Sequence, residues 1–209
     1  MSGVPAAAAL VLAAGAGRRM GGPKAVLCVE GLPLVAQHVA RLAEVGCSPV
    51  VVVVPPQVHG QVAQVLASWP YVRLVAAETA SQAHTLAVAA RELGPEPACE
   101  RVVVTPVDLV PARVETLLAL LGAVMGEVLC ASPTYRGQGG HPVVLRAALL
   151  EAYLGAGEPP PLRDVLEAAE QGRVRLEVED PAVARDFDTA EELLRATGRG
   201  PTFWARRVR

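Results

Sequence analysis

Residues 49–55 read Pro-Val-Val-Val-Val-Val-Pro. A short run of β-branched residues with proline at both ends is typical of a strand that is buried on both faces of a parallel sheet. Apolar runs at 8–12, 72–75 and 101–105 predict further strands, and helical patterns separate them. Strands that alternate with helices indicate βαβ units joined by right-handed crossovers. We therefore expect an α/β fold, a three-layer α/β/α sandwich built on a mostly parallel, doubly wound sheet.

The pattern changes after residue 126. Short strands are expected at 128–131 and 142–145, on either side of the glycine-rich stretch 136–140, and another strand at 174–178. This arrangement predicts one antiparallel strand and a small β excursion. Helical periodicity predicts helices over residues 33–45, 57–66, 82–93, 111–121, 162–171 and 189–197.

The composition indicates a globular domain and argues against several classes of partner. Hydrophobic residues make up 52% of the 209 residues and charged residues 19%, which suffices for a sizeable core. A net charge of −2 and an aromatic content of 3% argue against nucleic-acid binding. No apolar run is long enough to span a membrane. We expect one domain over residues 1–197 and an arginine-rich tail over 198–209 that is mobile and solvated.

The cysteines point to a reducing compartment. They are widely spaced and form no C-x-x-C pair, so they match no zinc or iron–sulfur pattern. We expect buried free thiols and a cytoplasmic location. The four cysteines are Cys28, Cys47, Cys99 and Cys130.

The chain contains one lysine, Lys24, against eighteen arginines, and this lysine closes a glycine-rich loop. Residues 12–24 read Leu-Ala-Ala-Gly-Ala-Gly-Arg-Arg-Met-Gly-Gly-Pro-Lys. Glycine lets the backbone approach a phosphate closely, and Arg18, Arg19 and Lys24 supply positive charge. The loop matches neither the dinucleotide pattern G-x-G-x-x-G nor the Walker pattern G-K-[ST]. It predicts a nucleoside triphosphate site; the alternative is a flexible loop with solvated charges.

Asp108 is a candidate metal ligand. It follows the strand expected at 101–105, and ligands of α/β proteins bind at the carboxyl ends of parallel strands. Mg²⁺ binds one or two carboxylates together with phosphate oxygens. The alternative is a turn or helix-capping role. Further along, Asp188 and Glu191 predict a capping box for the last helix, which does not exclude metal binding.

These segments resemble the signatures of the nucleotidyltransferases that activate cofactors and sugar phosphates. The nearest branch is the MobA-like, molybdenum cofactor cytidylyltransferase branch, and the guanylyltransferase branch is close to it. In its pattern L-A-A/G-G-x-S-x-R-M-G-x-x-K, the fixed positions correspond to Arg19, Met20, Gly21 and Lys24. The resemblance implies the nucleotide-diphospho-sugar transferase-like version of the α/β fold.

The resemblance also implies a metal site. The family's metal-binding aspartate stands in the context P-x-D-x-P, which is similar to the surroundings of Asp108. Its second ligand lies in D-I-D-T-P-E-D-L, which residues 186–193 resemble. By this resemblance Asp108 and Asp188 would hold Mg²⁺, with Asp186 in reserve.

The acceptor side is implied by a further segment. Residues 139–143, Gly-Gly-His-Pro-Val, resemble a G-H-P-V segment of the same branch. This implies that Gly140 and His141 bind the acceptor, with His141 donating to its phosphate; loop packing by this histidine is the alternative. Residues 81–86 depart from a G-x-x-x-S-L segment that helps to hold the base and ribose in that branch, with Thr85 and Leu86 in the place of S-L. Residues 154–162 depart from its L-x-G-D-x-G-A segment, so the acceptor side is expected to have changed.

The implied activity is transfer of a nucleoside monophosphate from a nucleoside triphosphate to a phosphorylated acceptor such as molybdopterin, with release of pyrophosphate. Lys24 and Arg19 would be the catalytic cations. Ala14, rather than a second glycine, resembles the cytidylyl branch and favours CTP over GTP. The expected nucleotide-binding residues are Leu12, Ala13, Ala14, Gly15, Gly17, Arg18, Gly21 and Thr85.

Other functions remain open at this stage. The chain could be a sugar-phosphate nucleotidyltransferase, or a glycosyltransferase with a nucleotide-sugar donor, since residues 186–188 form a D-x-D. A non-catalytic nucleotide-binding module is the third alternative. We expect a monomer or homodimer without nucleic-acid or membrane partners. His38 and His59 lie in helical patterns and are expected to be surface or packing residues.

Overall fold

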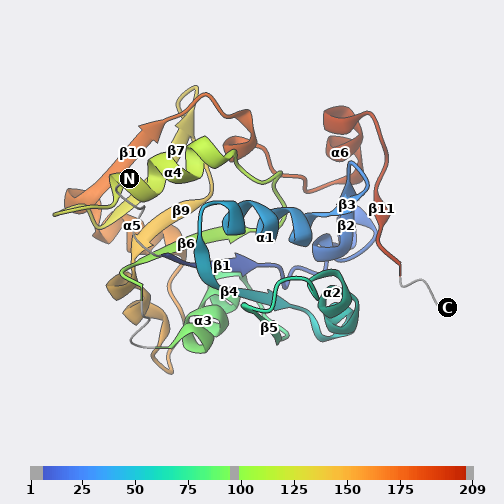
Figure 1. Cartoon of the computed structure of the whole chain (residues 1–209), viewed down its shortest axis with the longest axis horizontal. Coiled ribbons are helices and arrows are strands. Elements are labelled where there is room, and N and C mark those ends of the chain that lie inside the picture. The colour runs from blue at the N-terminus through green and yellow to red at the C-terminus, as the bar shows by residue number, and fades with distance from the viewer. Residues whose placement is uncertain (1–6, 95–98, 206–209) are drawn as a thin grey trace.

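The computed structural model describes residues 7–94 and 99–205. Its main sheet contains the strands β1 (Ala7–Leu12), β4 (Cys47–Val54), β5 (Val72–Ala76), β6 (Arg101–Pro106), β7 (Cys130–Tyr135), β8 (Gln138–Gly139), β9 (Val143–Arg146) and β10 (Arg173–Glu177). Seven of these strands follow the order β10-β7-β9-β6-β1-β4-β5, and β8 pairs with β7 (Figure 1).

The sheet is parallel except around β8 and β9. β9 is antiparallel to both β6 and β7, and β8 forms a hairpin with β7. The expected mostly parallel sheet, with one antiparallel strand and a small β excursion after residue 126, is confirmed. β1 lies between β4 and β6, and its last residue, Leu12, pairs with Val53 and Pro106. The carboxyl ends of three strands therefore meet at one edge, which brings the following loops together.

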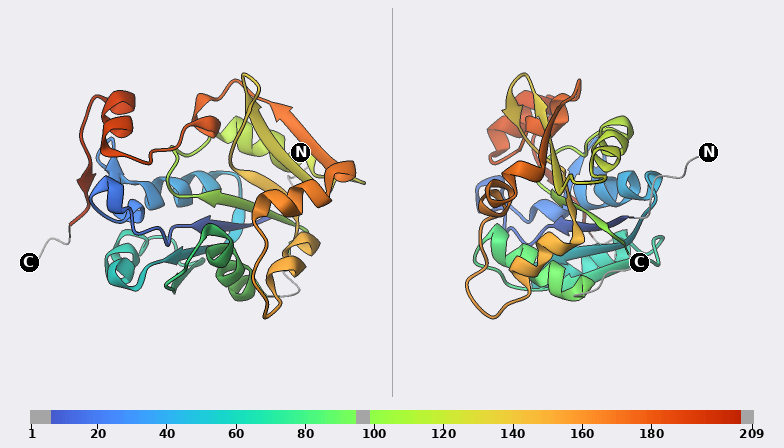
Figure 2. Two further views of the ribbon diagram at one scale, coloured as in Figure 1. Left: turned by 180° about the vertical axis from the view of Figure 1, so that it is seen from behind. Right: turned by 90° about the vertical axis from the view of Figure 1, so that its left-hand side faces the viewer.

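Helices cover both faces of the sheet, so the three-layer architecture is also confirmed. They are α1 (Leu34–Glu44), α2 (His59–Val65), α3 (Gln82–Leu93), α4 (Val114–Ala123), α5 (Leu162–Ala168) and α6 (Ala190–Thr197). Residues of α1, α2 and α4 pack against one face, and residues of α3 and α5 pack against the other. Figure 1 shows α1 and α4 in front of the sheet, and Figure 2 (left) shows α3 and α5 from behind.

The valine run at 50–54 joins the two cores. All five valines are completely buried, and they alternate between the two hydrophobic clusters. Burying a valine side chain contributes roughly 1.5–3 kcal/mol relative to leaving it exposed. The strand expected here is confirmed, and it begins slightly earlier, at Cys47.

A second, three-stranded sheet packs beside the main one. It consists of β2 (Leu27–Val29), β3 (Leu32–Pro33) and β11 (Thr202–Phe203), all antiparallel. The Trp204 N–H also donates to the Val26 carbonyl at 2.8 Å. The expectation of a mobile, solvated tail is therefore wrong for this segment, because backbone pairing holds it against β2. The last arginines of the chain, Arg206, Arg207 and Arg209, lie outside the described residues.

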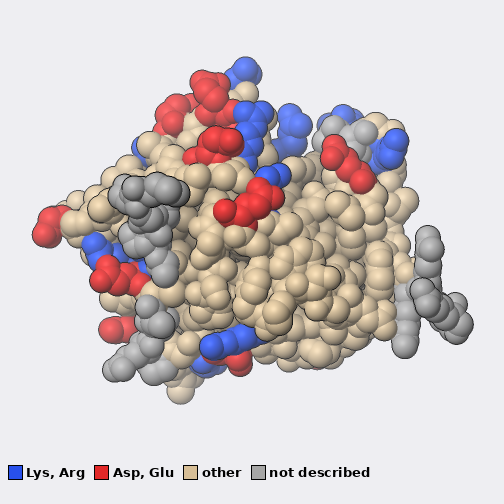
Figure 3. Space-filling view, in the orientation of Figure 1, with Lys and Arg blue, Asp and Glu red and all other residues tan. Residues whose placement is uncertain are grey.

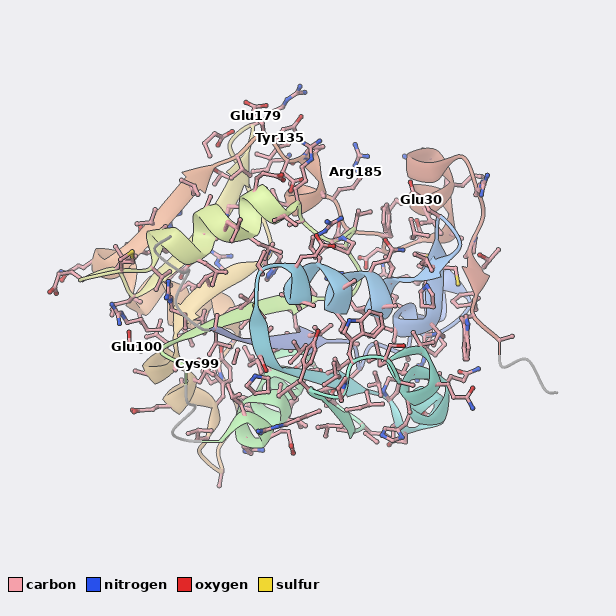
Figure 4. All side chains as sticks on the ribbon, in the orientation of Figure 1. Glu30, Cys99, Glu100, Tyr135, Glu179 and Arg185 are labelled. Atoms are coloured by element: carbon pink, nitrogen blue, oxygen red, sulfur yellow. The ribbon has the colours of Figure 1, made fainter. Side chains whose placement is uncertain are left out.

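The expectation of buried free thiols is confirmed for three of the four cysteines. All four cysteines are free thiols; three are buried and Cys28 is half-buried. Figure 4 shows Cys99 and Glu100 just before β6, at the end of that strand away from Asp108.

No helix within residues 7–94 and 99–205 has both the length and the apolar character to cross a membrane. Most of the face in Figure 3 is uncharged, and basic and acidic side chains are interspersed over its upper part.

Two distant segments are joined directly beyond the end of β6. The Phe187 N–H donates to the Asp108 carbonyl at 2.9 Å, and Leu109 and Asp186 form an isolated antiparallel bridge. The Phe187 side chain is buried in the same hydrophobic cluster as α1. This packing places Asp188 beside Asp108, although one precedes α6 and the other follows β6.

His38 of α1 supports the same region. Its ring is buried, and its Nε2 lies 3.0 Å from the Leu109 carbonyl oxygen. Burial lowers the pKa of His38 to about 4, against weaker opposing effects of the Leu109 carbonyl and the Asp108 charge. The ring is therefore neutral at pH 7, with an Nε2–H that donates to Leu109. A surface or packing role was expected; the structure shows a buried ring, and its hydrogen bond to the residue after Asp108 was not predicted.

We predict that His38→Leu destabilises the protein by about 1–3 kcal/mol at pH 7, because a buried carbonyl loses its donor. The pKa of His38 is lower in the folded state, about 4 against 6.5, so its contribution is complete above pH 6.5. That contribution is lost as the pH falls. The free energy of unfolding of the wild type minus that of His38→Leu should therefore decrease by about 3 kcal/mol between pH 7 and pH 4.

Urea unfolding across this pH range measures both effects. His59→Leu, at a half-buried histidine of α2, controls for replacing a histidine by leucine. A wild-type advantage over His38→Leu that does not change with pH would contradict the assignment.

Candidate active site

Three segments converge at the carboxyl edge of the sheet. The first is the loop after β1, which ends in a 3-10 turn over Lys24–Val26. The second follows β6 and carries Asp108; the third precedes α6 and carries Asp188. The side chain of Lys24 is only 11% exposed, which is unusual for a lysine and requires partners of opposite charge.

Lys24 meets both aspartates. Its Nζ lies 3.1 Å from Asp108 Oδ2 and 2.9 Å from Asp188 Oδ1. Arg19 Nη2 lies 3.1 Å from Asp188 Oδ2, and the Arg19 side chain is 70% exposed. The structure thus brings together the predicted catalytic cations and the predicted metal ligands. A buried ammonium and an exposed guanidinium both contact the Asp188 carboxylate.

The charges of this cluster stabilise one another. Burial by itself would lower the pKa of Lys24, but its contacts with Asp188 and Asp108 outweigh burial and raise the pKa. The hydrogen bond and charge of Lys24, with help from Arg19, lower the pKa of Asp188. At neutral pH the site therefore contains a protonated lysine and an ionised aspartate, and Lys24 is a donor and not a base.

Two glycines shape the loop from inside. Gly17 has φ +58°, and a Cβ at this position would overlap the Gly22 carbonyl oxygen. The Gly17 carbonyl accepts from the N–H groups of Met20 at 2.9 Å and Gly22 at 3.2 Å, and Met20 is buried beneath the turn. Gly21 has φ +89°, so it too needs glycine. Gly15 differs, since a Cβ there would meet nothing within 4 Å.

The predicted capping box is displaced by one residue. Thr189, not Asp188, is the N-cap of α6, and its hydroxyl accepts from the Glu192 N–H at 3.2 Å. Glu192 Oε2 in turn accepts from the N–H groups of Asp188 and Thr189, each at 2.9 Å. The expectation that Asp188 and Glu191 cap the helix is wrong. Because Thr189 caps the helix, the Asp188 carboxylate is available to Lys24 and Arg19.

A cavity of about 340 Å³ opens beside the loop. We call it the loop cavity; it is lined by Leu12, Ala14, Gly15, Ala16, Lys24, Thr79, Ala80, Ser81, Gln82, Thr85, Pro106, Val107 and Asp108. Its wall includes the predicted nucleotide-binding residues Leu12, Ala14, Gly15 and Thr85. The Thr85 hydroxyl lies 2.7 Å from that of Thr79.

The other predicted nucleotide-binding residues lie outside this wall. Ala13 is buried, and its N–H donates to the Val53 carbonyl, so it continues the sheet. Gly17 and Gly21 flank the 3-10 turn over Arg18–Met20, and Arg18 is exposed. Sequence analysis did not single out Thr79 as a wall residue. Its position just after β5, at the same sheet edge as Leu12, was the available signal.

The acceptor segment lies on the other side of Asp108. A junction cavity of about 290 Å³ is lined by Gln82, Pro106, Asp108, Leu109, Gly139, Gly140, His141, Val183, Ala184 and Asp186. The structure thus places Gly140, His141 and the reserve ligand Asp186 next to Asp108. A Cβ at Gly140 would overlap the Val183 carbonyl oxygen, and the His141 N–H donates to that same oxygen at 2.9 Å. Gly140 is therefore needed for packing as well as for the cavity wall.

The His141 ring is less suited to donation than expected. Burial lowers its pKa, so the ring is neutral at pH 7, although Asp108 and a Val104 backbone hydrogen bond oppose the shift. A neutral imidazole has one N–H, so at most one ring nitrogen of His141 can donate. Nδ1 is buried and has no hydrogen-bond partner among the described residues.

The donor set at Asp108 and Asp188 suits magnesium. Both contribute carboxylate oxygens, and both already converge on one cation, the Lys24 ammonium. The part of the chain that the structure describes contains no group of three or more His, Cys, Asp or Glu placed to hold a metal. Two carboxylates without further protein ligands fit Mg²⁺, which takes its remaining ligands from phosphates and water.

Comparisons with known proteins agree with this geometry. The family of the MobA-like NTP transferase domain matches residues 9–174. A comparison with curated proteins gave no match. Similar solved structures include a nucleotidyl transferase from Methanothermobacter, with a TM-score of 0.73 and 21% identity over 93% of this chain and 96% of that one.

Two further structures have the same fold. 4-Diphosphocytidyl-2C-methyl-D-erythritol synthase from Anaerococcus prevotii has a TM-score of 0.74 at 14% identity, over 93% of this chain and 96% of that one. Rv0371c from Mycobacterium tuberculosis H37Rv, solved in complex with manganese, has a TM-score of 0.75 at 18% identity, over 93% and 98%. Because the family match covers well over half of the chain, this protein belongs to the MobA-like NTP transferase domain family and is a nucleotidyltransferase.

Proposed function

We propose that the protein transfers CMP from CTP to the phosphate of a small acceptor and releases pyrophosphate in a Mg²⁺-dependent reaction. An oxygen of the acceptor phosphate attacks the α-phosphorus of CTP in line, and the bond to the pyrophosphate oxygen breaks. The observation that carries this proposal is the meeting of Lys24 with Asp108 and Asp188, where Asp108 lines both the loop cavity and the junction cavity. Molybdopterin is one candidate acceptor, on the strength of the sequence resemblance alone.

The loop cavity would take the nucleoside. Backbone groups between Leu12 and Gly15 would contact the base and ribose, together with Thr85 from α3. Gly15 supports this assignment, since the space beside its Cα is empty and lies in the cavity wall. Ala14 favours CTP over GTP by resemblance to the cytidylyl branch.

Asp108 and Asp188 would hold Mg²⁺. When bound, the ion would neutralise phosphate charge and help to align the reacting oxygens. A divalent-metal site at this place in the fold is supported by the oxygen-only donor set. The structural similarity to Rv0371c, whose structure was solved with manganese, agrees with this assignment.

Lys24 and Arg19 would neutralise the triphosphate. Phosphoryl-type transfer needs positioning and charge stabilisation more than covalent help. Lys24 would exchange its carboxylate partners for phosphate oxygens, which are also anionic and therefore favour the protonated ammonium. Arg19 is exposed enough to turn toward the leaving pyrophosphate. The acceptor phosphate is already an anion, so its attack needs no general base.

We expect Lys24→Met to lower the rate of pyrophosphate release from CTP at least about 100-fold, because charge stabilisation of the transition state is lost. Asp108→Asn should have a loss of similar size, and chelation of Mg²⁺ by EDTA should abolish release in the wild type. Coupled-enzyme detection of pyrophosphate, with CTP and GTP against a panel of phosphorylated acceptors, measures these rates.

Arg41→Met, at an exposed arginine that pairs with Glu44, is the matched control and should retain the wild-type rate. Full activity in Lys24→Met would refute the site. Release of a nucleoside diphosphate from a nucleotide sugar would favour the glycosyltransferase alternative, and CTP binding without turnover of any acceptor would favour the non-catalytic one.

Substitutions at Gly17 and Gly15 should distinguish an effect on stability from an effect on nucleotide binding. Gly17→Ala should lower the free energy of unfolding by about 1–3 kcal/mol, since alanine is strained at positive φ and its Cβ has no room. Gly15→Ala should change stability by less than about 0.5 kcal/mol and yet weaken CTP binding about ten-fold, because its methyl group enters the loop cavity. Thermal unfolding and calorimetric titration with CTP measure the two effects; equal loss of stability in both variants would contradict this division.

A further inference from the structure

We propose that the C-terminal strand β11 holds the nucleotide-binding loop in its binding conformation, and that Phe203 is a positioning residue for Lys24 and Arg19. The nucleotide-binding loop is defined here as residues 13–26, between β1 and β2. The proposal rests on the proposed function in one respect, because it takes this loop to bind the triphosphate. It adds a residue that acts on nucleotide binding through the loop and not by touching the nucleotide.

The ring of Phe203 lies against the middle of the loop. A Cβ built on Gly22 would lie 2.9 Å from Phe203 Cε1 and 3.1 Å from Phe203 Cζ, and a Cβ built on Gly21 would lie 4.0 Å from Cε2. The ring therefore occupies the space that a side chain at position 22 would take. The two glycines stand between Arg19 and Lys24 in the sequence. The ring thus rests on the backbone that joins the two predicted catalytic cations.

The same strand is bonded to the end of the loop. The Trp204 N–H donates to the Val26 carbonyl at 2.8 Å, and Phe203 pairs with Leu27. Val26 is the last residue of the 3-10 turn that begins at Lys24. Figure 1 shows β11 beside β2, its partner in the small sheet. The strand is therefore attached on both sides of Lys24, by the aromatic ring before it and by the backbone after it.

The two glycines have no side chains with which to fix the loop, and glycine has the largest backbone freedom of all residues. The Gly22 N–H donates to the Gly17 carbonyl at 3.2 Å, and the Gly21 N–H donates to the Arg18 carbonyl at 3.4 Å. Hydrogen bonds of this length restrict a glycine pair only weakly. The Phe203 ring removes alternative backbone conformations, so less ordering is needed when the triphosphate binds.

The strand that supplies the ring lies outside the region shared with the family. The match to the MobA-like NTP transferase domain covers residues 9–174, whereas β11 spans Thr202–Phe203. The strand has only two residues, and the Phe203 side chain is half-buried. We therefore expect β11 to detach more readily than the strands of the main sheet. By linkage, the factor by which docked β11 raises nucleotide affinity is also the factor by which bound nucleotide favours docking.

Substitutions at Phe203 and Gly22 separate positioning from stability. Phe203→Ala removes the ring, and Phe203→Leu keeps an apolar side chain without the Cε1 and Cζ atoms. Gly22→Ala places a methyl group against the ring. In the double variant Gly22→Ala/Phe203→Leu the two nearest ring atoms are absent, so the methyl group has room. Thr202→Ala, at an exposed side chain of the same strand, is the matched control.

Calorimetric titration of the full-length protein with Mg²⁺ and a CTP analogue measures nucleotide affinity. The analogue has a methylene bridge between its α- and β-phosphates, so no transfer occurs. All titrations are made well below the unfolding temperature of every variant, where a loss of stability alone does not change affinity.

We expect Phe203→Ala to raise the Kd of the analogue about ten-fold, because the loop must then be ordered on binding. Phe203→Leu and Thr202→Ala should stay within about two-fold of the wild type. Gly22→Ala should weaken binding about ten-fold, and the double variant should recover most of that loss. This last pair tests the inference even if Phe203→Ala fails to fold.

Hydrogen exchange of the Trp204 amide gives a second readout that packing alone would not change. This N–H is freed from the Val26 carbonyl when β11 detaches, so its exchange rate reports the docked fraction of the strand. Saturation with Mg²⁺ and the analogue should slow the exchange about ten-fold in the wild type, matching the effect of Phe203→Ala on Kd. An exchange rate that saturation leaves unchanged would contradict the coupling.

The outcomes separate this inference from the proposed function. If Lys24→Met weakens the analogue and Phe203→Ala does not, the nucleotide site stands and the positioning role alone is overturned. A loss in Gly22→Ala that Phe203→Leu fails to restore would also overturn the positioning role alone. If the analogue does not bind to the wild type, or binds equally well to Lys24→Met, the proposed function fails and the positioning role fails with it.

Discussion

One buried ammonium group holds the candidate site together. Lys24 Nζ lies within hydrogen-bond distance of Asp108 and Asp188, which follow it by 84 and 164 residues in the chain. A charge this far from water needs opposite charges beside it, and two adjacent carboxylates need a cation between them. The ammonium therefore links three segments that lie far apart in the chain.

The sheet and one backbone hydrogen bond make this meeting possible. Parallel pairing puts the ends of β1 and β6 side by side, and the Phe187 N–H docks the segment before α6 onto Asp108. The group at the centre must satisfy two carboxylates and remain able to turn toward phosphate. A compact ammonium with rotatable donors suits both tasks better than a rigid guanidinium, which gives a physical reason for a lysine in a chain of arginines.

The sequence predicted the large elements well and the small ones poorly. The valine run of β4 and the apolar face of α1 are local signals, so both elements could be predicted from neighbouring residues. The short strands β2, β3 and β11 have no periodicity and exist only because their backbones pair. The capping box was misplaced by one residue because both the pair Asp188/Glu191 and the pair Thr189/Glu192 fit the pattern, and only backbone geometry distinguishes them.

The α/β architecture and the membership in the nucleotidyltransferase family were determined by the sequence itself. Hydrophobic periodicity and the spacing of glycines and charges are relations between neighbours along the chain, so they can be seen without coordinates. Only the tertiary structure decided that Lys24 lies between two carboxylates, that His38 holds the residue after Asp108, and that the ring of Phe203 fills the space beside Gly22. These relations are distances between segments that share no local pattern, and packing alone sets them.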